Sequence, residues 1–481
     1  MVLQHPIFDN KAKVFLPILL VLLSIVTGVA VAFLSLKKLL ILLALIVGVI
    51  LVFLCVTNYK LGYSIALASG FSIFILSRYF MDAFPVGWIV EILIYSSFLG
   101  LMAHCLIRGE SLFDSLYHPI TAFLVLYLFY IIWQAFNPEM YSILGWFNFF
   151  RRQVMIFLLY ILTLHVIKSE KDVKRVFNIW LLFSIIAAAY AILTQIFRLP
   201  YFEEQWVMAS KNRQNLYYLV DGFKRKYSLY SDPAAFGMDM AATTLILLIF
   251  SFFAESKSIK IQNLFLALIC LLAAVYSGTR TAYLMIISGL VLFMLMRGIN
   301  RNTFLIGFAT LIGFIGFMKV PIYDNLFINR IRSAFHFSDD ASLQVRNINR
   351  ARIQPYIHSH SIGGGVYTTG GQGRDYNPEH MLAGFPPDSG YLKEALETGW
   401  IGLLVLLSLH FVILRSGIYA FFNNSNKQLK GMIVAATTAL FSFVIANYGQ
   451  DAFGQIPSCF LFCICIAIIT KSHQLNSNSI S

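Results

Sequence analysis

The sequence predicts an all-α polytopic membrane protein with about 12 to 14 transmembrane helices and two long loops on one side of the membrane. Of its 481 residues, 58% are hydrophobic and only 12% are charged, about half the charged share of an ordinary soluble domain. Apolar runs of about 17 to 25 residues, long enough to cross the hydrocarbon core of a bilayer, recur from end to end. These observations exclude a soluble enzyme with a tail anchor, a secreted disulfide scaffold and a nucleic-acid-binding domain.

Fourteen apolar segments are candidate spans. In chain order they are 14–34, 39–56, 61–76, 86–107, 119–136, 153–167, 176–197, 235–254, 261–276, 282–296, 303–318, 400–414, 431–448 and 457–470. They divide the chain into five parts. These are N-terminal transmembrane helices (1–197), a first long outer loop (198–234), central transmembrane helices (235–318), a large outer loop with short helices (319–399), and C-terminal transmembrane helices with a cytoplasmic tail (400–481).

The positive charge is distributed unevenly between the two ends of these spans. With the N-terminus in the cytoplasm, sixteen Lys and Arg residues fall in inside segments. Six fall in the short outside turns: Lys37, Lys38, Arg78, Arg151, Arg152 and Arg280. Cytoplasmic segments of membrane proteins carry such an excess. The sequence therefore predicts cytoplasmic termini, with both long loops on the outer side of the membrane. The net charge of +13 is then mainly a topology signal and requires no nucleic-acid partner.

All six cysteines fall within the predicted spans: Cys55, Cys105, Cys270, Cys459, Cys463 and Cys465. Since no long loop contains one, we expect lipid-facing or packing residues rather than disulfides or metal ligands.

The first long loop ends in a cationic triplet, Lys224-Arg225-Lys226, followed by Asp232-Pro233 and small residues. Asp-Pro predicts a turn that leads into a helix N-terminus. Free amides with Arg and Lys at a membrane boundary suit an anionic head group such as a phosphate. The alternative is that the triplet only solvates the loop or touches lipid phosphates.

The next outward turn contains Arg280 directly before a span. An ionisable residue at membrane depth indicates a functional site. The alternative is that Arg280 extends its side chain to the interface.

The second long loop contains several candidate residues. A helical pattern begins near Asp339 and carries Arg346 and Arg350, which are four residues apart and so share one face. Glycine-rich stretches at 363–365 and 370–373 follow, where the backbone can approach a ligand closely. Asp388 then precedes a short helix with Tyr391, and is either a catalytic carboxylate or the N-cap of that helix.

Three histidines of this loop, His358, His360 and His380, are further candidates for a general base. A metal site at His358 and His360 is not favoured, because no third ligand is close in sequence.

These pieces, in this order, resemble the O-antigen ligase and polymerase superfamily of bacterial inner-membrane glycosyltransferases. The resemblance rests on four motifs over about residues 221–404: Arg225-x-x-Ser228 with Pro233, Thr279-Arg280 opening a span, Arg346 through Gly363-Gly364-Gly365, and Asp388-Ser389-Gly390-Tyr391-Leu392 with Glu397-x-Gly399-x-x-Gly402.

The resemblance implies a GT-C-like, metal-independent, inverting transferase without a cofactor. It also implies a place in the bacterial inner membrane, with the active face and both long loops in the periplasm. Its substrate would be a glycan on undecaprenyl diphosphate. Arg225, Arg280 and Asp388 would be catalytic, and Arg346, Arg350, Lys226 and Tyr391 would bind substrate. Membrane lipids are expected partners, and a chain-length regulator is a further candidate.

Ligases of this family carry His where Asp388 stands. We therefore favour a polymerase, which joins lipid-linked repeat units into a capsule, exopolysaccharide or O-antigen chain. A ligase that transfers the glycan to a lipid or protein acceptor is the alternative. A transporter or flippase of the same lipid-linked oligosaccharides and an assembly scaffold are the competing classes, but the charged residues cluster at the outer face rather than along a path through the membrane.

Overall fold

The computed structural model describes residues 36–82, 85–218, 222–298, 332 and 341–477. Within them the chain is helical and forms no strand beyond two isolated bridges. The first half contains α2 (Leu36–Thr57), α3 (Tyr59–Tyr79), α4 (Gly87–Arg108), η1 (Asp114–Leu116), α5 (Pro119–Trp133), η2 (Gln134–Phe136), α6 (Ile143–Val166) and α7 (Glu170–Phe197). The second half contains α8 (Tyr201–Met208), α9 (Lys211–Tyr217), α10 (Pro233–Phe253), α11 (Lys257–Tyr276), α12 (Arg280–Arg297), α15 (Ala341–Ser359), α16 (Gly370–Tyr376), α17 (Gly390–Glu397), α18 (Gly399–Asn423), α19 (Lys427–Ala446) and α20 (Ser458–Ser477).

Eleven helices of the described part are long and apolar enough to cross a membrane, and α2 adds a shorter apolar stretch. They confirm the prediction of an all-α polytopic membrane protein. Twelve of the fourteen predicted spans coincide with one of these helices. The other two, 14–34 and 303–318, lie outside the described residues.

Three helices, α10, α19 and α20, form the centre of the bundle and are buried over most of their length. The sequences of α10 and α19 are rich in Gly, Ala, Ser and Thr, which allow helix backbones to approach closely within a membrane. A Cβ atom at Gly417 of α18, for example, would lie 2.3 Å from the Thr437 hydroxyl of α19. All six cysteines are buried and unpaired, which confirms their predicted role in packing.

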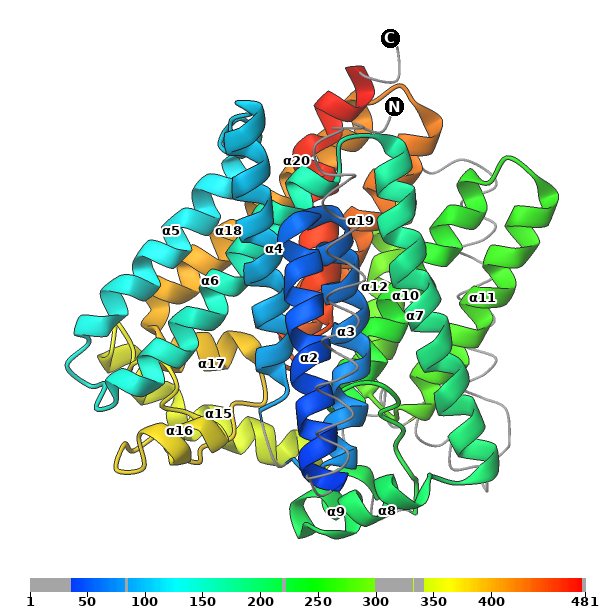
Figure 1. Cartoon of the computed structure of the whole chain (residues 1–481). Helices are drawn as coiled ribbons and strands as arrows, with labels where there is room; N and C mark the ends of the chain where they lie inside the picture. The colour runs from blue at the N-terminus through cyan, green and yellow to red at the C-terminus, as the bar shows by residue number, and fades with distance from the viewer. Residues whose placement is uncertain (1–35, 83–84, 219–221, 299–331, 333–340, 478–481) are drawn as a thin grey trace.

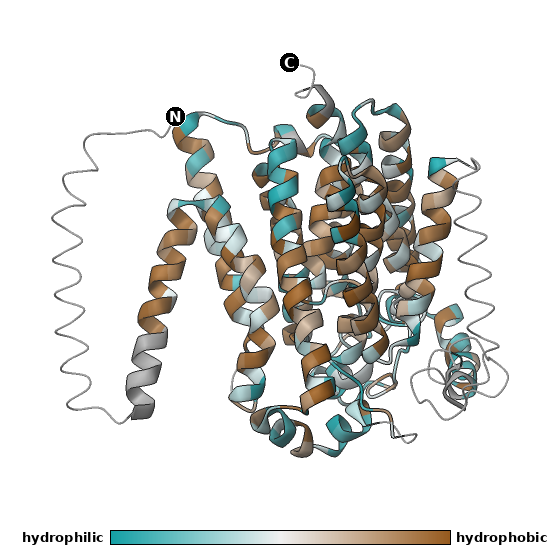
Figure 2. Cartoon of the chain, turned by 90° about the vertical axis from the view of Figure 1, so that its right-hand side faces the viewer, coloured by the Kyte–Doolittle hydropathy of each residue, from teal (hydrophilic) through white to brown (hydrophobic). Residues whose placement is uncertain are grey.

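Apolar residues cover the middle of the helices, and hydrophilic residues gather at the helix ends (Figure 2). The short helices α8, α9, α15 and α16 lie together at one end of the bundle, opposite the C-terminal end of α20 (Figure 1). We call this the loop-bearing end. The segment between α7 and α10 and the segment between α15 and α18 therefore meet there, although they are far apart in sequence.

The largest difference from the predicted spans is at α6, which begins at Ile143 rather than at residue 153. The additional turns carry Arg151 and Arg152. Arg151 pairs with Glu91 of α4, and Arg152 donates to the carbonyl of Gly454. The helix therefore continues through two charged residues because the protein interior supplies their partners.

Candidate active site

Arg225 lies against the turn that precedes α12. Its backbone amide donates to the Tyr217 carbonyl (2.9 Å), its Nε donates to the Ser277 carbonyl (3.0 Å), and its Nη2 donates to the Thr279 hydroxyl (3.1 Å). Arg280 is the first residue of α12. Two predicted catalytic arginines, separated by 55 positions in the chain, thus lie on adjoining segments.

The turn of residues 277–279 is fixed by its neighbours on both sides. Gly278 has φ +61°, and a Cβ there would lie 2.8 Å from the Phe223 ring. The Thr279 hydroxyl donates to the Pro233 carbonyl at the start of α10 (2.8 Å). Asp232 caps that helix by accepting from the amides of Ala234 and Ala235, as the Asp-Pro pair predicts. The position of Arg280 therefore depends on both α10 and the first loop.

Asp388 precedes α17, but it is not the N-cap of that helix. The cap is Ser389, whose hydroxyl accepts from the Leu392 amide. The capping alternative for Asp388 is therefore wrong, because the next residue already satisfies the exposed amide of the first turn. Asp388 is half-buried, and its carboxylate is not required to cap α17.

The segment between α19 and α20, residues 447–457, which we call the central loop, joins these motifs. The Gly390 amide donates to the carbonyls of Asn447 (2.9 Å) and Gln450 (3.2 Å). On the other side, a Cβ at Gly449 would lie 3.4 Å from the hydroxyl of Thr281, the residue after Arg280. The central loop therefore lies between the segment that carries Asp388 and the segment that carries Arg280.

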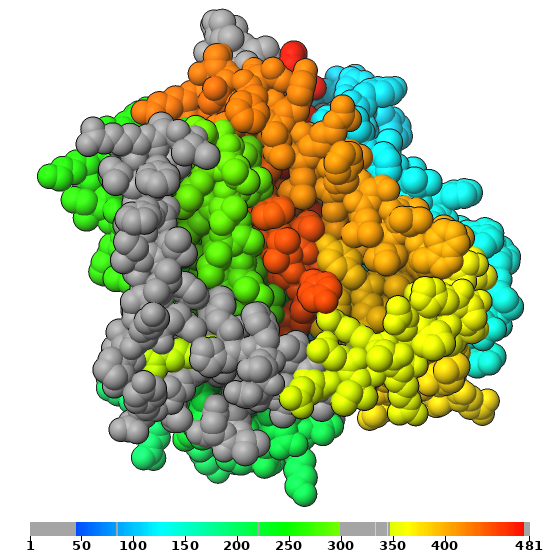
Figure 3. Space-filling view, turned by 180° about the vertical axis from the view of Figure 1, so that it is seen from behind, coloured from blue at the N-terminus to red at the C-terminus, as the bar shows by residue number. Residues whose placement is uncertain are grey.

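Arg350 of α15 contacts the same loop. Its guanidinium donates to the hydroxyl (2.9 Å) and the carbonyl (3.1 Å) of Tyr448 and lies 4.5 Å from the centre of the Tyr448 ring. Seen from behind, the face between α12 and α15 with α18 is recessed, and the C-terminal part of the chain forms the floor (Figure 3). Four motif segments thus meet around one recess at the loop-bearing end.

Two predicted substrate contacts point away from this recess. Lys226 is buried, and its amine donates to the Thr194 carbonyl (3.0 Å). Burial lowers the pKa of this amine to about 8. The Tyr391 hydroxyl donates to the Val444 carbonyl (2.8 Å) and lies 3.3 Å from Nδ1 of His410. Arg346 belongs to α15, and its side chain lies outside the described residues.

The glycine-rich stretch packs against α17. The amides of Gly364 and Gly365 donate to the carbonyls of Leu396 and Glu397 (both 2.8 Å). The buried Glu397 carboxylate in turn accepts from the amides of Tyr367 and Thr369. A Cβ at Gly363, where φ is +74°, would lie 2.4 Å from the Gly399 amide nitrogen. These glycines therefore allow two chain segments to approach, rather than a chain and a ligand.

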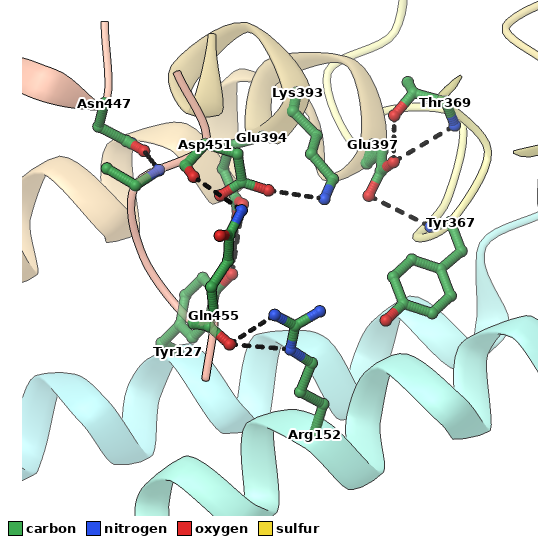
Figure 4. A network of polar contacts seen from close by, with 12 residues as sticks. Tyr127, Arg152, Tyr367, Thr369, Lys393, Glu394, Glu397, Asn447, Asp451 and Gln455 are labelled. Atoms are coloured by element: carbon green, nitrogen blue, oxygen red, sulfur yellow. Dashed lines mark hydrogen bonds and ion pairs between the residues drawn. The ribbon is translucent and has the colours of Figure 1, made fainter. Parts of the chain in front are cut away.

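A second group of charged side chains surrounds an internal cavity of about 130 Å³ beside α17. Lys393 pairs with Asp451 of the central loop at 3.0 Å. Glu394 accepts from the hydroxyls of Tyr127 (3.1 Å) and Thr398 (2.9 Å). Figure 4 shows these side chains together with Arg152, which reaches the same cavity from α6.

The enclosed environment of this cavity changes its chemistry. Burial raises the pKa of the Glu394 carboxyl to about 7, against the hydrogen bonds from Thr398 and Tyr127, which favour the charged form. Burial also raises the pKa of Glu397. The cavity therefore contains a carboxyl group that titrates near neutral pH. Among the described residues, no group of three or more His, Cys, Asp or Glu side chains is arranged to hold a metal ion.

The sequence signal for this second group was weak. Lys393 and Glu394 stand next to the Tyr391 motif, but nothing in the sequence indicates that they face Asp451 or Tyr127. Arg152 was counted only as a charge in an outside turn. The aromatic residues at 146–150 continue the apolar pattern of α6 toward the N-terminus. They are the sequence signal that could have predicted a helix extending beyond Arg152.

Sequence reasoning also missed Arg78, which is almost fully buried at the end of α3. It pairs with Glu203 of α8 at 2.6 Å and donates to the carbonyls of Ser228 (2.6 Å) and Tyr230 (3.3 Å). Arg78 thus anchors the segment between Arg225 and the start of α10.

Comparison with curated proteins gives no match. Residues 265–407 match the family model described as O-antigen ligase. The matched segment contains the Arg280 turn, Arg350, the glycine-rich stretch and the Asp388 motif, which are the segments that border the recess or pack behind it. This match supports the predicted resemblance of the chain to the O-antigen ligase and polymerase superfamily, and with it a function of the glycan-transferase type.

Proposed function

We propose that the protein is a polysaccharide polymerase. In this proposal it transfers a glycan from undecaprenyl diphosphate to a second lipid-linked repeat unit at the periplasmic face of the inner membrane. The observation that carries the proposal is that three motif segments, those with Arg280, Arg350 and Asp388, contact the central loop. The fourth segment brings Arg225 against the turn that precedes Arg280.

The arrangement suits a lipid diphosphate leaving group. When the bond between C1 of the donor sugar and the phosphate oxygen breaks, negative charge develops on the diphosphate. Fixed cations at that position stabilise the transition state more than the ground state. Arg225 and Arg280 supply such charge at the N-terminus of α12, where the helix dipole also favours an anion. The transfer proceeds without a metal ion in this proposal.

Asp388 serves as the general base. It accepts the proton of the acceptor hydroxyl as the hydroxyl oxygen attacks C1 of the donor sugar from the face opposite the diphosphate. The configuration at C1 is inverted, and undecaprenyl diphosphate leaves with the bonding electrons. A carboxylate performs this role as a histidine can, so the Asp that replaces the ligase His is compatible with transfer.

The direct test uses the purified protein in detergent with undecaprenyl-diphosphate-linked repeat units. The proposal predicts longer lipid-linked chains, in the presence of a chelator, resolved by gel electrophoresis or mass spectrometry. A ligase would leave single units unjoined until a lipid or protein acceptor is added. Movement of unchanged substrate across liposomes would instead identify a transporter and refute the proposal.

The base is tested by substitution. Asp388→Asn should lower chain elongation by about 10²- to 10⁴-fold, the usual contribution of general acid–base catalysis. Asp388→His should retain a substantial part of the activity, because imidazole can also accept the proton. Full activity of the Asn variant would remove Asp388 from the chemistry while leaving the family assignment intact.

A further inference from the structure

A groove of about 1050 Å³ opens at the loop-bearing end between α4, α6 and α16. Trp88 and Glu91 of α4 and Phe147 of α6 line one side, and Gln372 and Asp375 of α16 line the other. This space is much larger than the internal cavity and has the volume of a typical small-molecule site. No motif of the sequence pointed to it.

The groove combines exposed aromatic rings with polar groups that lack partners. Trp88 and Phe147 are both 53% exposed. The Gln372 amide and the Asp375 carboxylate form no hydrogen bond or ion pair within the described ranges. Gln455 of the central loop also lines the groove, and its Oε1 is buried without a hydrogen-bond partner. Such an orphan acceptor requires a donor from water or from a ligand.

The charges of the groove argue against an anionic ligand. The two lining arginines, Arg151 and Arg152, are matched by two carboxylates, Glu91 and Asp375, so the formal net charge of these four groups is zero. Arg151 is already paired with Glu91, and Arg152 is bound to the Gly454 carbonyl. What remains is a neutral surface of aromatic rings and planar amide and carboxylate groups. Rings of this kind pack on the C–H faces of sugars, and planar acceptors and donors bind their hydroxyls.

The groove and the internal cavity share two lining residues, Arg152 and Tyr367. The wall of that cavity also includes Gly390 and Asn447, which hold the start of α17 beside Asp388. The central loop therefore separates the groove from the recess beside α12. The helices α4 and α6 face the viewer in Figure 1, whereas the recess faces the viewer in Figure 3, which is turned by 180°.

We propose that this groove is a carbohydrate-binding site that holds sugar units of the acceptor glycan, on the side of the central loop opposite the diphosphate-binding arginines. The assignment to the acceptor rests on the proposed polymerase function. A polymerase must hold two glycans at once, and the groove provides a second position that does not compete with the leaving group. The affinity of the groove for sugar does not depend on the proposed polymerase function, because it is inferred from the residues that line the groove.

The experiment measures binding and elongation separately. The probe is the set of oligosaccharides of one to a few repeat units released by mild acid from the lipid-linked material that accumulates in cells without the protein. Binding to the purified full-length protein is followed by saturation-transfer NMR. Trp88→Ala and the pair Gln372→Ala with Asp375→Ala should each weaken binding by roughly fivefold to tenfold, the value of one aromatic or a few polar contacts. Trp133→Ala is the matched control. Trp133 is 48% exposed at the C-terminal end of α5, and it does not line the groove.

In the elongation assay the groove variants should raise the acceptor concentration at half-maximal rate by a similar factor and leave the rate at saturation within about twofold. Equal binding by the wild type and all groove variants would refute the site. If the wild-type protein does not bind the oligosaccharides and the groove variants elongate normally, the carbohydrate site is also refuted, but the proposed polymerase function is not. Sugar binding that depends on Trp88 in a protein that elongates nothing would refute the polymerase and support the carbohydrate site.

Discussion

Removal of the Glu203 carboxylate provides a test of how the first loop is held. The Arg78–Glu203 pair is inaccessible, with side-chain exposures of 2% and 0%. In the variant Glu203→Gln, Arg78 keeps its bonds to the carbonyls of Ser228 and Tyr230 but loses the carboxylate with which it forms its ion pair. Breaking a buried pair by removing one partner costs about 3 to 5 kcal/mol, because it leaves an uncompensated charge out of water.

The same change at an exposed pair should have a small effect. Lys168 and Glu110 lie 2.9 Å apart, but their side chains are 42% and 38% exposed. Exposed pairs contribute at most about 1 kcal/mol, so Glu110→Gln is the matched control. With an unfolding entropy of about 1 kcal/mol/K for a chain of this size, Glu203→Gln should lower the melting temperature by about 3 to 5 °C and Glu110→Gln by at most about 1 °C.

The assay is thermal unfolding of the purified variants in one detergent at one scan rate, followed by circular dichroism or light scattering. The double variant Arg78→Met with Glu203→Leu should be more stable than the sum of the two single changes predicts, by about 1 to 3 kcal/mol. Equal melting temperatures for Glu203→Gln and Glu110→Gln would refute the reasoning, since burial would then not distinguish the two pairs.

Three further predictions concern the site. Gly390→Ala should abolish elongation, because the new Cβ would lie 2.0 Å from the Asn447 side-chain oxygen and displace the central loop, whereas Gly371→Ala, with no atom within 4 Å, should retain activity. Arg350→Ala should lower elongation at least tenfold without preventing membrane insertion, and unchanged elongation would exclude Arg350 from the site. Because the pKa of Glu394 is raised from 4.5 to about 7, its stabilising effect is present below pH 4.5 and is lost as the pH rises to 7. Glu394→Gln should therefore remove up to about 3 kcal/mol of this pH dependence, measured as melting temperature against pH, and identical profiles would contradict the assigned burial.

The spans could be predicted from the sequence because the membrane requires a long apolar helix wherever the chain crosses it. The predicted span for α6 began too late because Arg151 and Arg152 were assigned to an outside turn. Their partners, Glu91 and Gly454, are 60 and 302 positions away. The local sequence contains no signal for a contact of that kind. The same holds for Arg78 and Glu203, which are 125 positions apart.

The central loop shows why the site itself was predicted only in part. The motif arginines and Asp388 could be named from the sequence, because few charged residues occur on the outer side. The segment that brings them together contains no motif. Its position follows from the packing of α19 against α10 and α12, and that packing depends on small residues spread over three helices.

The structure also separates the family signature into two kinds of position. Ser389 caps α17, Gly390 leaves room for Asn447, and the Tyr391 hydroxyl binds the Val444 carbonyl. Glu397 and the glycines hold the loop behind α17. These residues shape the scaffold, and their side chains are committed to other parts of the chain. Asp388 is not required for capping, and the central loop lies between its segment and the Arg280 turn. If Asp388 is the base, as we propose, a scaffold of this kind can keep its glycines and its glutamate while the base differs between His and Asp. In this proposal the identity of residue 388 bears on the choice between ligase and polymerase, whereas the rest of the motif bears on the fold.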